Sequence, residues 1–241
     1  VFAQCDFSAS QLKGNTVNQA NFIQCDFKTS LWHSNCEMAT LSECDFSGSV
    51  WQEVAVQSTT MSTCNFSGVT FNQCQWHTVT LSEARAAKSV FNDNVFYNIA
   101  WIKTDFTTIS LNKSSFTQAL LLECDFSGQD LTDTDFTYCT CNESVFIGTK
   151  FTNANLEGSN FSKSVLTGVD FSGALLKQGL FIESAIKGCV FDQADLTNAN
   201  FQQALVEATS FIACQLSQSW MKGIKASKTD FSQSDLSYAN L

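Results

Sequence analysis

The chain has 241 residues, of which 44% are hydrophobic and 15% charged, and its formal net charge at pH 7 is −10. It contains 22 Phe but 3 Tyr, 11 Cys but 2 His, and no Pro. The hydrophobic content excludes a disordered chain, and the acidity disfavours direct binding of nucleic acid through its phosphates. No apolar run approaches the roughly 18 residues that would span a membrane, so no membrane association is expected. No signal peptide is visible, and because residue 1 is Val we expect a piece excised from a longer protein that carries other domains.

An apolar residue recurs at every fifth position along the whole chain. One series runs from Phe2 to Phe27 and a second from Leu31 to Leu241, so the sequence predicts a one-residue register slip between 27 and 31. All 22 Phe occupy this position, which we call the centre of each unit. Self-similarity at a fixed period is the signature of a repeat architecture.

The other positions of the unit are also restricted, and we number them −2, −1, +1 and +2 from the centre. Position −2 is small, position −1 is often Asp or Asn, and ten of the 11 Gly occupy position +2. Side chains two apart on extended backbone point to the same side, so −2 and the centre are predicted to face inward. Gly at +2 fits a corner, since it accepts a positive φ. Four such corners would close a coil of about 20 residues around a filled interior.

Units such as Cys44-Asp45-Phe46-Ser47-Gly48 and Ala154-Asn155-Leu156-Glu157-Gly158 resemble the pentapeptide-repeat family. The resemblance covers the whole chain. It implies an all-β fold, a right-handed quadrilateral parallel β-helix of about 12 coils, with residues 1–241 forming a single domain.

The cysteines are predicted to be structural. Nine of the 11 lie at −2, while Cys36 and Cys141 are centres, and buried Cys behaves as a small hydrophobe. Stacked cysteines roughly 4.8 Å apart could form disulfides, although nothing indicates secretion. Cys139 and Cys141 lack a second ligand pair, so no metal site is expected. With no concave site and His33 and His77 on different coils, we expect no catalytic residue, no cofactor and no enzyme activity.

Two groups of residues are candidates for a surface that binds a protein partner. One is an acidic belt between Leu121 and Ser144, which also has a plain explanation, because the repeat favours Asp before its centre. The other is a pair of Trp expected to point outward, where a singly exposed apolar residue can equally be incidental. The full candidate set is Glu123, Asp125, Asp130, Asp133, Asp135, Glu143, Trp32 and Trp220.

Two functions follow from these observations. The first is a non-enzymatic structural or protein-interaction module, a rigid spacer or docking domain of a larger bacterial protein, with secretion-associated proteins among the family's fused members. The alternative, implied by resemblance to quinolone-resistance members of the Qnr type, is a DNA mimic that binds DNA gyrase. This chain lacks the loop insertions and C-terminal helix of those members. Reduced cysteines favour the cytoplasm, or export by a route that needs no signal peptide.

Overall fold

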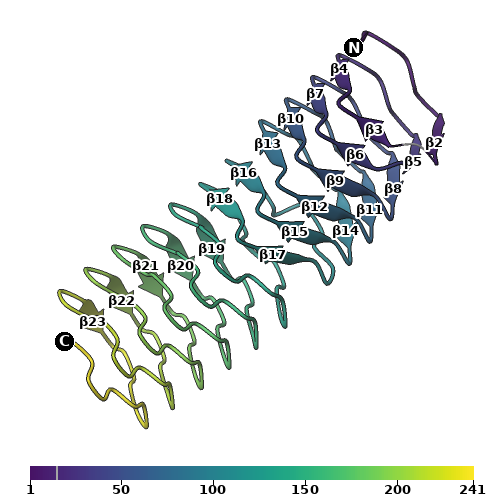
Figure 1. Ribbon diagram of the computed structural model, residues 1–241. Helices are drawn as coiled ribbons and strands as arrows, with labels where there is room; N and C mark the ends of the chain where they lie inside the picture. The colour runs from purple at the N-terminus through teal and green to yellow at the C-terminus, as the bar shows by residue number, and fades with distance from the viewer. Residues whose placement is uncertain (15) are drawn as a thin grey trace. The chain divides into compact units, whose positions relative to one another are not determined.

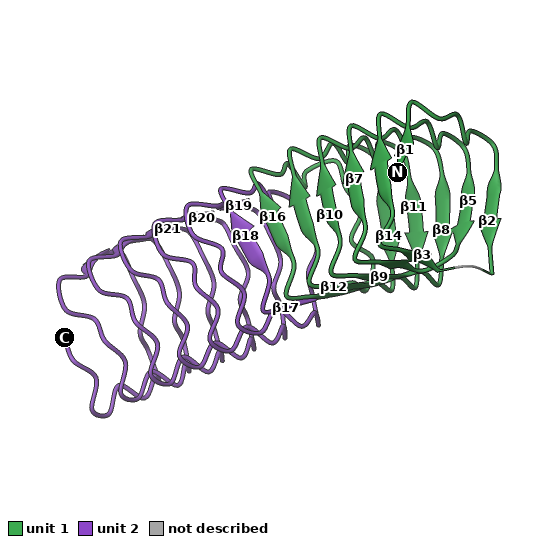
Figure 2. Cartoon of the chain, turned by 45° about the horizontal axis from the view of Figure 1, so that its top comes forward, with its two compact units in different colours: residues 1–115 green, residues 116–241 purple. Residues whose placement is uncertain are grey.

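The computed structural model describes residues 1–14 and 16–241, which divide into two compact units, unit 1 (Val1–Ser115) and unit 2 (Phe116–Leu241; Figure 1, Figure 2). Each unit is a parallel β-solenoid whose coils pair backbone with the coils before and after. The described residues form strands, bridges and turns, and none of them forms a helix suited to crossing a bilayer. The all-β parallel β-helix predicted from the repeat is therefore confirmed.

Unit 1 has three extended faces, each a ladder of parallel strands. The first contains β1 (Phe2–Ala3), β4 (Asn21–Ile23), β7 (Thr40–Ser42), β10 (Thr60–Ser62), β13 (Thr80–Ser82) and β16 (Ala100–Ile102). The second contains β2 (Gln11–Lys13), β5 (Leu31–His33), β8 (Val50–Gln52), β11 (Thr70–Asn72) and β14 (Val90–Asn92). The third contains β3 (Val17–Asn18), β6 (Cys36–Glu37), β9 (Ala55–Gln57), β12 (Gln75–His77) and β15 (Val95–Tyr97). Single bridges along Asp6, Asp26, Asp45, Asn65 and Arg85 make the fourth face.

Unit 2 has one ladder of five parallel strands. It contains β19 (Val145–Ile147), β20 (Val165–Thr167), β21 (Ala185–Lys187), β22 (Leu205–Glu207) and β23 (Lys225–Ser227). Two further strands, β17 (Ser115–Thr117) and β18 (Leu120–Leu122), come earlier in the chain. The other faces of unit 2 are joined by single bridges, such as the series Asp130, Lys150 and Asp170.

Asp or Asn at −1 explains many of the turns between bridges. The Asp45 carboxylate accepts a hydrogen bond from the backbone N–H of Ser47 at 2.9 Å, and Asp170 accepts one from Ser172 at 2.9 Å. A short polar side chain that bonds the backbone two residues on favours a turn over a continued strand. Position −1 therefore shapes the backbone as well as the surface.

Position +2 does form the corners of the coil, as predicted, but residues other than Gly form corners there as well. A left-handed φ recurs there, at +67° in Gly48 and +66° in Gly158, and also at +54° in Glu53 and +55° in Lys103. Side chains at such φ values carry a steric cost that Gly avoids. The solenoid imposes this geometry at nearly every corner, and most of these corners have a residue other than Gly.

The register slip lies five residues later than predicted, and this corrects the placement of Trp32. Trp32 has no exposed surface and stacks on Trp51 with ring centroids 4.6 Å apart. It is the true centre of its unit, paired with Leu12 on one side and Trp51 on the other. The next centre is Cys36, so the missing residue belongs between Trp32 and Cys36, and the ladder spacing there falls from 20 to 19 residues, as in the pair Val17 and Cys36.

Stacked centres fill the interior, and the −2 residues tie adjacent coils together. Phe181 and Phe201 lie 4.7 Å apart and within 4° of parallel, an arrangement repeated along the core. The Ser164 hydroxyl donates to the carbonyl of Cys141 at 2.7 Å, and the Cys189 thiol to that of Leu166 at 3.3 Å. A small residue with a donor therefore fits −2 in both size and bonding.

Candidate interaction surfaces

The six acidic residues of the predicted belt do not share one face. Asp125, Asp130 and Asp135 lie at −1 on three different faces, since they bridge to Val145, Lys150 and Asn155 respectively. The other three, Glu123, Asp133 and Glu143, are exposed corner residues with φ of 52°, 56° and 59°. The belt therefore encircles the coil, and no partner with a single flat surface can contact all six residues.

The three belt Asp at −1 also accept hydrogen bonds from the backbone two residues on. Asp125 accepts hydrogen bonds from the backbone N–H of Ser127 at 2.9 Å and from the Ser127 hydroxyl at 2.5 Å. Asp135 accepts one from the backbone N–H of Thr137 at 3.0 Å. Hydrogen bonds from the Thr132 side chain and backbone lower the pKa of Asp130, whose carboxylate also lies 3.6 Å from the Lys150 amine. These contacts support the plain explanation that the repeat uses Asp to form turns. The role of the belt in partner binding stays a prediction.

Trp220 does lie on the surface, as expected from its −1 position. Its exposed fraction is 49%, and its backbone bridges Asn200 and Asn240 in register. The exposed Lys222 follows on the other side of the buried centre Met221. An indole and an amine thus flank one centre on a face that the backbone ladder holds fixed.

The cysteines are free thiols, and all except the half-buried Cys5 are buried. Burial raises the pKa of Cys36 and Cys189 to about 11, and that of Cys74 and Cys214 to about 12. Thiols that stay protonated are poor nucleophiles and poor metal ligands. Among the residues that the structure describes, no group of three or more His, Cys, Asp and Glu is arranged to hold a metal ion.

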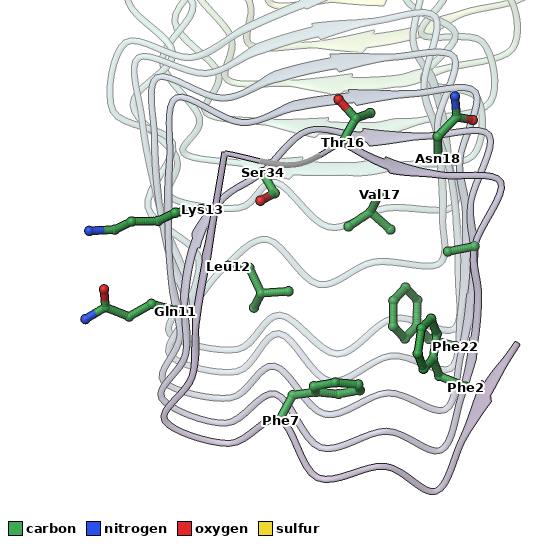
Figure 3. Close-up of a pocket in the computed structure, with 11 residues that line it drawn as sticks. Phe2, Phe7, Gln11, Leu12, Lys13, Thr16, Val17, Asn18, Phe22 and Ser34 are labelled. Atoms are coloured by element: carbon green, nitrogen blue, oxygen red, sulfur yellow. The ribbon is translucent and has the colours of Figure 1, made fainter.

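A concave apolar site lies at the N-terminal end of unit 1, where the sequence predicted none. Phe2, Phe7, Leu12, Val17 and Phe22 point into it, while Gln11 and Lys13 point away from it (Figure 3). Phe2 is 45% exposed, whereas Phe22 is buried. These apolar residues are centres of the first coils, the same position that forms the buried core further along unit 1. The site offers apolar contact and no inward charge.

The repeat itself identifies the family. The family model described as pentapeptide repeats matches in eight copies, at residues 109–140, 139–178 and 181–211. The chain is a pentapeptide-repeat protein. The matched residues lie almost wholly in unit 2, where centre, −2 and corner positions follow the pattern most regularly.

Solved structures with a similar fold include other pentapeptide-repeat proteins. HetL, involved in regulation of heterocyst differentiation in the cyanobacterium Nostoc, is 16% identical, with 99% of this chain and 90% of HetL covered and a TM-score of 0.31. QnrB1, a plasmid-mediated fluoroquinolone resistance protein, is 16% identical, with 92% and 94% covered and a TM-score of 0.27. A pentapeptide-repeat protein of the Arabidopsis thaliana thylakoid lumen is 28% identical over 48% of this chain and 67% of its own, with a TM-score of 0.16. No curated protein matches the chain.

Proposed function

We propose that the chain is a non-enzymatic protein-interaction module, a docking domain of a larger bacterial protein. The observation that carries this proposal is the half-exposed Trp220 beside Lys222, at a −1 position where the repeat often has Asp or Asn. Trp is enriched at protein contacts because its large ring buries apolar area while its N–H keeps a polar partner. An adjacent amine adds preference for a partner with a carboxylate near an apolar pocket.

The fixed backbone supports this reading. The backbone N–H of Trp220 donates to the Ala199 carbonyl at 2.9 Å, and the backbone N–H of Met221 donates to the Asn240 carbonyl at 2.6 Å. The exposed indole therefore projects from a ladder bonded on both sides. A preorganised anchor loses little conformational entropy on binding, which favours a docking role over an incidental exposure.

Site-specific photocrosslinking tests this proposal. A benzophenone amino acid at position 220, in the full-length protein in its own cells, should yield a discrete adduct with another protein. The same amino acid at Gln215, an exposed −1 residue on a different face, is the matched control. Excess Trp220→Ala protein should compete less well than the unchanged protein. Equal crosslinking at 215 and 220, or none at 220, would contradict the proposal.

One feature of unit 1 favours the alternative of a gyrase-binding DNA mimic. Asp6, Asp26 and Asp45 stack in register on a single face, each bridged to the next. The Lys28 amine lies 2.9 Å from Asp26 and 3.5 Å from Asp45, which offsets part of this negative charge. The row is the only specific support for this second candidate, and the repeat's own use of Asp at −1 weakens it.

A supercoiling assay with purified gyrase decides this second candidate. Inhibition at micromolar protein should fall when Asp6, Asp26 and Asp45 are all replaced by Asn, because the amide oxygen keeps the turn bond while the charge is lost. If the unchanged protein neither inhibits gyrase nor protects it from quinolone, the alternative is wrong.

A further inference from the structure

The outward face of the β19–β23 ladder differs from the other faces of unit 2. Its −1 row reads Asp125, Val145, Val165, Ala185, Leu205 and Lys225 in register. Four apolar side chains thus replace the usual Asp or Asn, and Val165 and Leu205 are 42% and 52% exposed. Ile147 at +1 adds a further side chain that is 50% exposed. Aligned apolar exposure of this kind marks a contact surface more strongly than scattered exposure does.

The border of this face is also unusual. The corner that follows it carries Gly128, Gly148, Gly168 and Gly188 in consecutive coils, and a Cβ added at any of them would meet open space. No side chain therefore rises along this edge from Gly128 to Gly188, and Ala208 follows in the next coil, so a flat partner can approach the apolar row closely. The opposite corner carries charged residues, including Lys163 and Glu183.

The charges of this face point to a second copy of the same chain as its occupant. The −1 row has a carboxylate at one end, Asp125, and an amine at the other, Lys225. At +1, the Lys187 amine lies 3.3 Å from the Glu207 carboxylate, so the charges of these two residues offset each other. The outward −1 and +1 residues from 125 to 227 hold two acids and two bases, so this face is neutral on a chain with a net charge of −10. It is a surface on which two copies can meet without like-charge repulsion.

We propose that two copies pack these faces together in antiparallel orientation, about a two-fold axis that runs along the strands. Such an axis reverses the order of the coils and sets each −1 row against itself. With the axis between Val165 and Ala185, Val145 faces Leu205 of the second copy, and Asp125 faces Lys225 of the second copy at both ends. At the charged corner, Lys163 faces Glu183 of the second copy, again twice. Packed sheets lie about 10 Å apart, a separation that the four apolar side chains can fill.

The parallel arrangement fits less well. A two-fold axis along the solenoid would set the −1 row against the +1 row, so that Leu205 would face Glu207 and Lys225 would face Ser227. No opposite charges would meet at the ends of the row. The proposed pairing does not depend on the proposed function, because Trp220 lies on a different face from Lys225.

Sedimentation equilibrium of the purified chain, across concentrations, tests whether the dimer forms. The mass should rise with concentration from 26.5 kDa towards twice that value. Leu205→Lys should hold the protein at the monomer mass. Leu175→Lys is the matched control, because Leu175 is also at −1 and 47% exposed but lies on another face, and it should dimerise as the unchanged chain does. A chain that stays monomeric at about 0.5 mM, or equal loss in both variants, would overturn the proposal.

Charge reversal tests the antiparallel pairing. Lys225→Asp and Asp125→Lys should each weaken dimerisation about tenfold or more, since each change sets like charges together twice per dimer. The double variant should regain the original dissociation constant, which also shows that the single variants fail for electrostatic rather than folding reasons. Asp135→Lys, which removes the same kind of turn bond on another face, should leave the dimer intact. A double variant as weak as the singles would rule out this orientation.

Discussion

Leu31 and Trp32 are adjacent apolar residues with opposite roles. Trp32 is fully buried, donates from its indole N–H to the Ser30 hydroxyl at 3.1 Å, and stacks on Trp51, whereas Leu31 is half-buried. Trp32→Asp should therefore abolish folding of the N-terminal coils, because it buries an unpaired charge in a stacked core. Leu31→Asp should cost less than about 1 kcal/mol, as expected for a surface change.

Circular dichroism and urea unfolding of the two variants measure this difference. Val50→Asp, at the equivalent −1 position one coil later, is a control that should behave as Leu31→Asp does. If Leu31→Asp were the variant that fails to fold, the slip would lie between 27 and 31 after all.

The same pair of residues shows where inference from the sequence stops. The period of five predicts nearly every centre, because only a large apolar side chain fills the interior. It cannot choose between Leu31 and Trp32, since both are apolar and both follow a small residue two positions earlier. What decides is the corner: Ser34 directly follows His33 and turns inward, so the residue lost is a +2 corner residue, and ladder pairing then makes Trp32 the centre.

At the scale of one element, the −2 hydroxyls act as ties between coils. Ser164→Ala should lower the free energy of unfolding by about 1 kcal/mol, because the Cys141 carbonyl loses its 2.7 Å partner inside the core. The urea midpoint of unfolding measures the change. Ser164→Cys should recover part of the loss, since Cys189 makes the equivalent bond with its thiol. A neutral Ser164→Ala would mean that small size alone determines this position.

The sequence predicted that these residues are small and inward, but it did not reveal what they bond. The partner carbonyl lies 23 residues earlier, a separation that follows from the coil length and not from any local motif. The surface of unit 2 was missed for a similar reason. Val145, Val165, Ala185 and Leu205 are unremarkable one at a time, and become a stripe only when the ladder stacks them in register.

At the scale of the whole molecule, four buried thiols, Cys36, Cys74, Cys189 and Cys214, make stability depend on alkaline pH. Burial raises the pKa of Cys36 and Cys189 to about 11, from an ordinary value of 9.0. Burial also raises the pKa of Cys74 and of Cys214. In the unfolded chain these thiols lose their protons above pH 9, whereas the folded chain keeps them protonated. Their contribution is therefore complete below pH 9 and falls as the pH rises towards 11.

Urea unfolding under reducing conditions, between pH 7 and pH 10.5, measures this dependence. Each of the four thiols Cys36, Cys74, Cys189 and Cys214 should remove about 1.4 kcal/mol from the free energy of unfolding per pH unit above 9. Cys189→Ala should make the slope shallower by about that amount. Ser164→Ala, which removes no titrating group, should lower stability equally at both ends of the range. A free energy of unfolding that stays level from pH 9 to pH 10.5 would mean that the thiols ionise in the folded chain as readily as in the unfolded one, contrary to their burial.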